Sequence, residues 1–467
     1  MRVVMKFGGT SVGGADNIRR VVSVIKGSLE DGIEPVVVVS AMAGVTDTLE
    51  RAAEEAPSWS EEEIKSYVGK LRHLHVETVE NLISSSIVAR EVMGTIESLL
   101  DELEKVLIGL SYVGEVTPRS RDLVLSFGER LSAPIVSGAL RDVGIDSEPL
   151  EGGEAGVVTD DRFGEAEPIM PECQRRARRV LEPMLNAGKV PVVTGFIGRT
   201  LDGDVTTLGR GGSDYSAAIL GAALGVDEVQ IWTDVDGIMT ANPKLVPDAR
   251  TVERLSYEEA MELASFGAEV LHPKTVIPVR EPGIPVRVKN TFNPDAPGTL
   301  ITSTADRAEH VVKAVASSSD VGVVDLRGIT MIGRPGIAGR VFSRLGDEGI
   351  NVIMISQSAS ESNISIIVSE DDAEKAAKAL EREFVGEGVL ESVEFTTDAS
   401  VVAVVGEGMR GTPGVAARVF DAVSRRGVNV KTISQGASEL NISFVVAEED
   451  EKDAVRAVHD EFELGGS

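Results

Sequence analysis

The sequence of 467 residues contains a single cysteine, Cys173. One cysteine cannot form a disulfide within the chain, and its scarcity is typical of proteins from a reducing compartment, so we expect a cytoplasmic protein. Aromatic residues make up only 4% of the sequence, whereas hydrophobic residues make up 42%. The cores are therefore expected to consist of Val, Ile, Leu and Ala.

Positive charge is also scarce. Lysine and arginine total 46 residues against 75 aspartates and glutamates, which gives a formal net charge of -29. Such a chain repels a polyphosphate backbone, so we expect no nucleic-acid partner. No apolar run reaches the ~18 residues that a membrane span requires. The N-terminus turns polar at Lys6, unlike a signal peptide. The sequence therefore predicts no membrane partner.

The C-terminal part of the sequence contains an internal repeat. Matching segments lie 78 residues apart without insertion: Pro335-Gly336 and Pro413-Gly414, Asn351-Val352 and Asn429-Val430, Ile355-Ser356-Gln357 and Ile433-Ser434-Gln435, and Asn363-Ile364-Ser365 and Asn441-Ile442-Ser443. Each copy has the pattern strand, Pro-Gly turn, amphipathic helix, strand, strand, helix, which predicts a ferredoxin-like α+β unit. We therefore expect two such domains, at residues 304–395 and 396–467, whose exposed sheet edges can pair with one another.

Residues 1–303 follow a different pattern, in which short apolar strands end in glycine or serine clusters and lead into helices. The runs Val3–Phe7, Val36–Val39, Val190–Thr194 and Glu228–Thr233 are almost continuously apolar, as in strands buried on both faces of a sheet. They predict an α/β domain with a mostly parallel sheet. Between about residues 60 and 115, charged helical periodicity replaces the strands, which indicates a helical insertion.

Four polar segments in this region contain the residue types that bind anions. They are Lys6–Ser11, Ser40–Asp47, Thr207–Asp214 and Thr233–Pro243. Loops after parallel strands converge at one edge of the sheet, where glycine N–H groups, lysine and arginine can bind phosphate or carboxylate. The acidic residues of the last segment could hold Mg²⁺ or sugar hydroxyls. Taken alone, each segment is also compatible with an ordinary tight turn or helix cap.

Five segments together resemble the signature segments of the aspartate kinase family. They are Lys6–Val12, Ser126–Ser132, Gly209–Asp214, Thr233–Ile238 and Phe266–Pro273, in the family's order. The repeat resembles the tandem ACT domains of that family. The resemblance implies an amino-acid-kinase (carbamate-kinase-like) fold and ATP-dependent phosphorylation of the β-carboxylate of L-aspartate, the first step toward lysine, threonine and methionine. Because the sequence ends after the second repeat, we expect a monofunctional enzyme without the homoserine dehydrogenase module of some members.

The resemblance also implies a role for individual residues. Catalytic roles are expected for Lys6, Gly8, Gly9 and Asp214, and L-aspartate binding for Ser40, Thr46, Glu129, Arg210 and Ser213. ATP, together with Mg²⁺ whose ligands the sequence does not identify, is expected at Lys6, Phe7, Gly8, Gly9, Thr10, Ser11, Thr233, Asp234, Met239 and Lys244. The attacking carboxylate is already ionised at neutral pH, so no general base is required. Glu129 has a simpler alternative role, a salt bridge to Arg130 or a helix cap.

Three positions depart from the usual pattern of the family. Met239 and Asn242 stand where a tyrosine and an aspartate are common, and Glu269 stands where a lysine is frequent. The last difference reverses a charge near the expected adenine, so we expect the nucleotide contacts to differ in detail there.

The repeat is expected to bind an amino-acid effector. In the family, effectors bind at ACT seams beside the turn that here spans Met331–Ala338. The expected effector residues are Met331, Gly336, Ile337, Ala338, Asn351, Gln357, Asn363 and Gln435. Gln357 and Gln435 resemble glutamines associated with threonine recognition, which favours threonine over lysine, although both could instead only tie strands together. We also expect a homo-oligomer, a dimer or tetramer, assembled through the ACT domains.

Two other functions are compatible with parts of the sequence. One is another kinase of the same fold, acting on acetylglutamate, glutamate, carbamate or UMP, but such relatives lack the opening Lys6–Ser11 segment and normally lack a tandem ACT tail. The other is a catalytically inactive amino-acid sensor. Against it stands the convergence of Lys6, Glu129, Arg210 and Asp214, because a mere scaffold does not need these polar groups.

Overall fold

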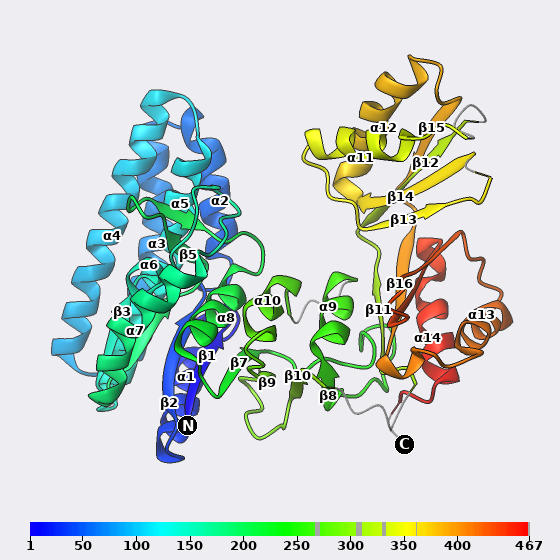
Figure 1. Cartoon of the computed structure of the whole chain (residues 1–467). Helices are drawn as coiled ribbons and strands as arrows, with labels where there is room; N and C mark the ends of the chain where they lie inside the picture. The colour runs from blue at the N-terminus through cyan, green and yellow to red at the C-terminus, as the bar shows by residue number, and fades with distance from the viewer. Residues whose placement is uncertain (267–270, 305–310, 329–332, 361, 466–467) are drawn as a thin grey trace. The chain divides into compact units, whose positions relative to one another are not determined.

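The computed structural model describes residues 1–467 except 267–270, 305–310, 329–332, 361 and 466–467. The chain forms two compact units, drawn in Figure 1 and described separately below. The first unit contains Met1–Ile238, Glu253–Tyr257 and Val270–Thr304. The second contains Met239–Val252, Glu258–Glu269 and Ala305–Ser467.

The first unit is built around an eight-stranded sheet with the order β3-β4-β2-β1-β7-β9-β10-β8. Its strands are β1 (Arg2–Phe7), β2 (Glu34–Val39), β3 (Ser147–Leu150), β4 (Val190–Thr194), β7 (Glu228–Thr233), β8 (Arg254–Ser256), β9 (Val286–Asn290) and β10 (Thr299–Thr302). The strands from β3 to β9 in this order run parallel, whereas β10 is antiparallel to β9. All of β4 and all but the first residue of β2 are buried, which confirms the mostly parallel sheet.

The helices of the first unit are α1 (Ala15–Glu30), α2 (Val45–Glu55), α3 (Glu61–Leu82), α4 (Ser86–Val113), α5 (Pro118–Asp142), α6 (Gly152–Ala155), α7 (Met170–Asn186), α8 (Gly212–Leu224) and α10 (Ile277–Arg280), with the short 3-10 turns η1 (Ala56–Ser58) and η2 (Pro273–Val276). Two short strands, β5 (Ile197–Arg199) and β6 (Val205–Thr207), form a separate ribbon. Helices α3 and α4 are the predicted helical insertion. Ser60 and Glu63 form the capping box that starts α3.

Helix α5 is the most deeply buried long helix of this unit. Thr117 caps it and Pro118 occupies its first turn, as is common at helix starts. Among the described helices, α5 alone is long and apolar enough to cross a membrane, but 89% of its apolar stretch is buried, as in the core helix of a globular domain. The segment Ser126–Ser132 lies in the middle of this helix, so its side chains project from a rigid support.

The second unit contains two four-stranded sheets, β13-β14-β12-β15 and β11-β16-β18-β17. Its elements are α9 (Tyr257–Ser265, which begins on the last residue of the first unit's 253–257 segment), β11 (Ala314–Ser318), β12 (Val321–Arg327), α11 (Ile337–Asp347), β13 (Met354–Gln357), β14 (Asn363–Ser369), α12 (Glu370–Leu380), η4 (Glu381–Val385), β15 (Ser392–Thr396), β16 (Ser400–Val405), η5 (Glu407–Met409), α13 (Val415–Arg425), β17 (Thr432–Gln435), β18 (Asn441–Val446), η6 (Glu448–Asp450) and α14 (Glu451–Glu461). The two predicted ferredoxin-like folds are present, one per sheet.

The boundary predicted between these two domains differs from the structure at one strand. Residues 314–318 were expected in the first ferredoxin-like domain, but as β11 they pair antiparallel with β16 of the second sheet. There β11 takes the edge position that β15 takes beside β12 in the first sheet. The first domain is therefore inserted between β11 and the rest of the second. The matched residues of the repeat begin at Pro335, after this strand. The repeat therefore could not indicate which of the two sheets the strand joins.

The edge strands β13 and β17 lie beside each other. The Ser356 hydroxyl donates a hydrogen bond to the Ile433 carbonyl oxygen, with 3.2 Å between the two oxygens. The predicted contact between the two sheet edges is thus present as a side-chain hydrogen bond, and the described strands form two sheets rather than one continuous ladder.

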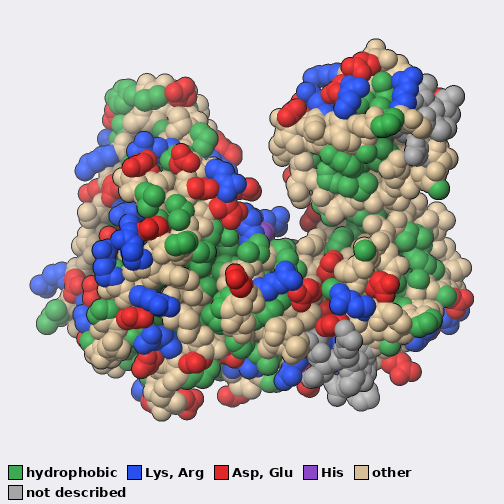
Figure 2. All heavy atoms as spheres, in the orientation of Figure 1, with side chains coloured by type: hydrophobic (Ala, Val, Ile, Leu, Met, Phe, Trp, Pro, Cys, Tyr) green, Lys and Arg blue, Asp and Glu red, His purple; other side chains and the backbone are tan. Residues whose placement is uncertain are grey.

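Acidic and basic side chains are interspersed over the surface that Figure 2 shows, in keeping with the many ion pairs between surface arginines and carboxylates. Single exposed pairs of this kind contribute little to stability.

Candidate active site

The loops after β1, β2, β4 and β7 are adjacent because parallel pairing continues beyond the strands. The Gly8 N–H donates to the Trp232 carbonyl at 3.1 Å, and the Ser40 N–H donates to the Phe7 carbonyl at 3.1 Å. On the other side of β2, the Gly195 N–H donates to the Val39 carbonyl at 2.8 Å. The predicted convergence of the segments at the carboxyl ends of the strands is therefore present for these loops.

Lys6 forms an ion pair with Asp214, with 2.6 Å between Nζ and Oδ1. Lys6 comes from β1 and Asp214 from the first turn of α8, and their side chains are only 12% and 11% exposed. The next two glycines allow a close backbone approach, because a Cβ on Gly8 would lie 3.4 Å from Lys6 Nζ and one on Gly9 would lie 3.1 Å from the Ala41 carbonyl oxygen. A lysine ammonium beside bare backbone suits an anionic ligand.

Glu129 is a buried carboxyl group on α5, and its side chain faces the loop after β2. Its Oε1 accepts a hydrogen bond from the Ala41 N–H at 3.1 Å, while Oε2 is buried and has no hydrogen-bond partner among the described residues. Burial raises the pKa of Glu129 to about 8, against the opposing effects of the Ala41 hydrogen bond and the Lys6 charge. An unsatisfied buried carboxyl oxygen is costly, which indicates a site for a cationic partner.

The alternative role of Glu129 as the partner of Arg130 is wrong. The Arg130 guanidinium pairs with Glu102 and Glu151 and stacks over the Phe127 ring. The side chains of Glu129 and Arg130 therefore lie in different environments, and the Glu129 carboxyl group is not paired with Arg130.

The segment from Gly209 to Ser213 adopts a turn that favours glycine at two positions. Gly209 and Gly211 have φ values of 75° and 71°. A Cβ on Gly211 would lie 2.3 Å from His272 Cβ, and one on Gly195 would lie 2.7 Å from Ser213 Cβ. These close contacts place Ser213 against the loop after β4, while the Arg210 side chain between the two glycines is exposed.

The remaining predicted aspartate-binding residues flank the Ala41 N–H that binds Glu129. Ser40 precedes Ala41 at the end of β2, and Thr46 lies in the first turn of α2. Both residues are half-buried. They are therefore close in sequence to the Glu129 contact and partly accessible to a ligand.

Two of the predicted ATP-binding side chains belong to the core instead. The Phe7 ring is fully buried and stacks on Trp232 at 5.8 Å between ring centroids. Ser11 is also fully buried, and its hydroxyl is hydrogen-bonded to that of Thr291 at 2.7 Å. Only Thr10 of these three is exposed. Any contact of Phe7 or Ser11 with a nucleotide would have to be made by the backbone.

The loop after β7 combines one exposed and one engaged aspartate. The Thr233 hydroxyl donates to Asp234, which is exposed. Asp236 accepts hydrogen bonds from the side-chain amides of Asn290 and Asn293. The described residues contain no group of three histidine, cysteine or acidic side chains able to hold a metal ion. Of the two aspartates, Asp234 is thus the more exposed, whereas Asp236 is half-buried and held by two asparagines.

The predicted nucleotide-binding residues Met239 and Lys244 belong to the segment Met239–Val252 of the second unit. There the backbones of Met239 and Thr251 form an isolated antiparallel β-bridge. The Lys244 N–H donates a hydrogen bond to the Asn242 side chain. Lys244 itself is exposed. Glu269, where a charge reversal was noted, lies outside the described residues.

Two further residues at the site were given no role by sequence reasoning. His272 packs on Gly211, and its pKa is lowered by burial and by the charges of Lys274 and Arg210, against that of Asp214. The motif Phe266–Pro273 drew attention to this histidine without indicating its contact. Asp122 is fully buried on α5 and binds the residues before Gly209. Nothing in the sequence indicates which loop a buried aspartate binds.

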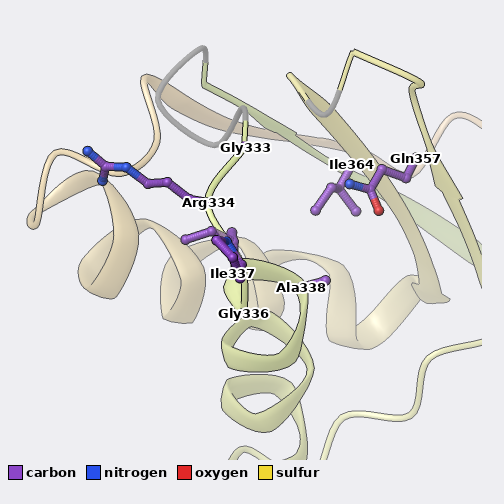
Figure 3. A pocket seen from close by; sticks show the side chains of 8 residues that line it. Gly333, Arg334, Gly336, Ile337, Ala338, Gln357 and Ile364 are labelled. Atoms are coloured by element: carbon purple, nitrogen blue, oxygen red, sulfur yellow. The ribbon is translucent and has the colours of Figure 1, made fainter.

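A cavity of about 330 Å³ lies in the first ferredoxin-like domain (Figure 3). It is lined by Gly333, Arg334, Pro335, Gly336, Ile337, Ala338, Gln357 and Ile364. Gln357, from the edge strand β13, and Ile364, from its neighbour β14, lie opposite the turn that starts α11, whereas the Arg334 side chain points away from Gln357. Four predicted effector residues, Gly336, Ile337, Ala338 and Gln357, are thus brought together.

The other predicted effector residues do not line this cavity. Asn351 and Gln435 are exposed, Asn363 is half-buried, and Met331 lies outside the described residues. In the second repeat, the Gly411 N–H donates to Glu439 Oε2 at 2.6 Å.

Comparison with known proteins agrees with this arrangement. Residues 1–290 match the amino acid kinase family, and residues 324–384 and 402–462 match an ACT domain. The chain is 36% identical over 469 residues to Aspartokinase 1, chloroplastic, of Arabidopsis thaliana, covering 98% of this chain and 80% of the relative.

Solved structures give the same result. The structure of E. coli aspartokinase III in complex with aspartate and ADP (R-state) matches with a TM-score of 0.83 and 31% identity, over 99% of both chains. The same enzyme in complex with lysine and aspartate (T-state) matches with a TM-score of 0.80 and 31% identity, over 98% of this chain and 99% of the other. The chain therefore belongs to the aspartokinase family and is an aspartate kinase with an amino acid kinase domain and two ACT domains.

Proposed function

We propose that the chain transfers the γ-phosphoryl group of ATP to the β-carboxylate of L-aspartate and forms 4-phospho-L-aspartate and ADP. In this reaction a carboxylate oxygen of aspartate forms a bond to the γ-phosphorus, and the bond between that phosphorus and the bridging oxygen of ADP breaks. The observation that carries the proposal is the buried Glu129 carboxyl group beside the Lys6–Asp214 ion pair. These groups offer one site for an ammonium and one for a phosphoryl group.

The aspartate is bound through its two backbone charges. The ionised Glu129 accepts the α-ammonium, which supplies the missing partner of its buried Oε2 atom. Arg210 binds the α-carboxylate by two parallel hydrogen bonds. Ser40, Thr46 and Ser213 position the β-carboxylate for attack. Ser40 follows β2, and Thr46 and Ser213 lie in the first turns of α2 and α8.

Lys6 stabilises the phosphoryl group during transfer. Its ammonium is held by Asp214 and borders Gly8, so it is oriented before ATP binds. Positioned charge of this kind accounts for most of the catalysis of phosphoryl transfer. Asp214, which was expected to be catalytic, thus acts as a positioning residue through its contact with Lys6. ATP brings Mg²⁺ bound to its phosphates.

A catalytically inactive sensor is the main competing function. A scaffold would not retain a fully buried carboxyl group with one oxygen unsatisfied, since this arrangement destabilises the folded protein. Another kinase of the same fold would require a different amino-acid or nucleotide acceptor. Trapping the product with hydroxylamine tests the proposal, because an acyl phosphate forms a hydroxamate and a phosphate ester does not.

We further propose that the cavity of the first ACT domain binds an amino-acid effector, with threonine favoured over lysine. Gln357 can donate to a ligand carboxylate or hydroxyl and accept from an ammonium. The volume of about 330 Å³ lies within the range of roughly 300–1,000 Å³ that is common for small-molecule sites. The lysine complex of E. coli aspartokinase III makes lysine the alternative to be tested.

The assembly and the cellular context remain predictions. We propose a homo-oligomer formed through the ACT domains, a cytoplasmic location, and a role in the synthesis of lysine, threonine and methionine. The single cysteine, Cys173, is buried, and burial raises its pKa to about 11.

A further inference from the structure

Asp122 is a fully buried aspartate that holds two loops of the first unit together. Its Oδ2 accepts hydrogen bonds from the Gly164 N–H and the Thr207 N–H, both at 2.9 Å. Its Oδ1 accepts a third from the Thr207 hydroxyl at 2.8 Å. A buried carboxylate with three donors of this kind forms a strong and directional connection.

These bonds fix the start of the turn that carries Arg210. Thr207 is the last residue of β6 and lies three positions before Arg210. The intervening Gly209 packs directly on the other loop, because a Cβ there would lie 3.2 Å from Glu165 Cγ and 3.3 Å from the Gly164 carbonyl oxygen. The Ala166 N–H also donates to the Thr207 carbonyl at 2.9 Å. Asp122 therefore supports the turn both at Thr207 and through Gly164.

The same helix carries the residue proposed to bind the other charge of the substrate. Asp122 and Glu129 are seven residues apart on α5, which places them on one face of the helix with a rise of about 10 Å between them. One rigid helix thus supports the Glu129 carboxyl group directly and the Arg210 turn through Asp122.

We propose that Asp122 is a positioning residue that sets the distance between Glu129 and the Arg210 turn, and thereby the fit of the α-ammonium and α-carboxylate of the amino-acid substrate. This inference rests on the proposed roles of Glu129 and Arg210. Asp122 does not itself contact the substrate.

The test compares variants of the full-length chain by KM for L-aspartate, KM for ATP, kcat and Tm. Asp122→Ala is expected to raise the KM for aspartate about tenfold or more, because a displacement of about 1 Å is enough for a large loss. The KM for ATP should stay within about twofold of the wild type. A merely destabilised fold would have no reason to change the KM for aspartate alone, so this difference separates positioning from general destabilisation.

Asp122→Asn provides the conservative rescue. Its amide oxygen can accept both N–H bonds, and its NH₂ group can donate to the Thr207 hydroxyl, so all three contacts are retained. The KM for aspartate is expected within about threefold of the wild type, because an amide group replaces the carboxylate in each hydrogen bond and no bond is lost. An Asp122→Asn variant as impaired as Asp122→Ala would contradict positioning by hydrogen bonds.

Asp142→Ala is the matched control. Asp142 is the last residue of α5 and accepts hydrogen bonds from the N–H groups of Ser84 and Ser85 at 2.9 and 2.7 Å. It has the same chemistry on the same helix but holds a loop remote in sequence from Arg210. This variant is expected to lower Tm and to leave the KM for aspartate within about twofold.

If Asp122→Ala does not fold, Thr207→Val tests the same contact, because it removes the hydroxyl that is hydrogen-bonded to Asp122 Oδ1 at 2.8 Å and to the Gly164 carbonyl oxygen at 3.4 Å, and it keeps the Thr207 N–H. It should raise the KM for aspartate several-fold. An unchanged KM in Thr207→Val and in every folded Asp122 variant overturns the inference. Glu129→Gln and Arg210→Lys distinguish a failure of this inference from a failure of the proposed aspartate site. If these two variants raise the KM for aspartate while the Asp122 and Thr207 variants do not, only this inference fails. If they have no effect either, the proposed aspartate site is wrong.

Discussion

The ammonium of Lys6 and the carboxylate of Asp214 form an ion pair of 2.6 Å from which water is largely excluded, since the two side chains are 12% and 11% exposed. Burial makes the attraction stronger than that of a surface pair. It also leaves Asp214 as an uncompensated charge if the lysine is removed. The pair thus links the first strand of the kinase domain to the first turn of α8 at the point where we propose that phosphoryl transfer takes place.

Replacing Lys6 by alanine should abolish nearly all turnover while the protein stays folded. The transferring phosphoryl group loses its nearest cation, and one such contact is worth about 100-fold or more in kcat. Steady-state kinetics measure the loss of turnover, and a thermal melt shows whether the variant stays folded. Lys189→Ala is the control, because Lys189 pairs with Glu148 at the surface and should leave kcat unchanged. A Lys6→Ala variant that keeps more than about a tenth of the wild-type rate would refute the role.

Arg210→Lys and Glu129→Gln should weaken the binding of aspartate much more than that of ATP. Lysine cannot reproduce the two parallel bonds of a guanidinium to a carboxylate, and glutamine has no charge to offer an ammonium. KM values for both substrates provide the measurement. Equal changes in the two KM values would show that these residues do not bind the amino acid.

The KM for aspartate should depend on pH through Glu129. Its pKa in the protein without ligands is raised to about 8, mainly by burial, and only the ionised form can hold an ammonium. Below this pKa, binding must also release a proton, so the KM should fall as pH rises from 7 to 8, by at most about tenfold per pH unit. It should level off above pH 8. In Glu129→Gln this dependence should disappear, and its persistence there would assign it to another group.

Much of the kinase domain follows from local sequence patterns. The apolar runs predict the parallel strands, and Lys6, Glu129 and Asp214 do meet at the carboxyl ends of those strands. Phe7 and Ser11 lie in the same motif but are core residues: the Phe7 ring, at the end of β1, stacks on Trp232, and the Ser11 hydroxyl, in the following turn, is hydrogen-bonded to Thr291. Sequence proximity to a site is therefore not evidence that a side chain reaches it.

Long-range partners were the part that sequence could not predict. Asp122 binds Thr207 across 85 positions of sequence, and no periodicity indicates that pairing. Similarly, β11 joins the second ACT sheet although it precedes the first ACT domain in the chain. The repeat predicts equal roles for Gln357 and Gln435, but only Gln357 lines the cavity. Such differences depend on the tertiary packing around each residue, and that packing differs between the two copies of the repeat.

Gln357→Ala should raise the concentration of threonine needed for inhibition by about fivefold or more. An effector typically changes the affinity at a coupled site by a factor of about five or more, and this variant should lose at least that much. Activity without effector should hardly change. Gln435→Ala is the matched control at the equivalent position of the second repeat, and it should leave the inhibition within about twofold of the wild type. Inhibition curves with threonine and with lysine make the comparison. If neither amino acid affects activity or Tm of the wild type, the repeat does not sense these effectors.

The most direct test of the central claim is the rate of ADP release from Mg²⁺–ATP, measured by a coupled assay with and without L-aspartate. We predict that ADP release requires L-aspartate, that hydroxylamine traps an equivalent amount of hydroxamate, and that Lys6→Ala abolishes both. Release at the same rate without aspartate, or release that requires acetylglutamate, glutamate, carbamate or UMP instead, would contradict the account.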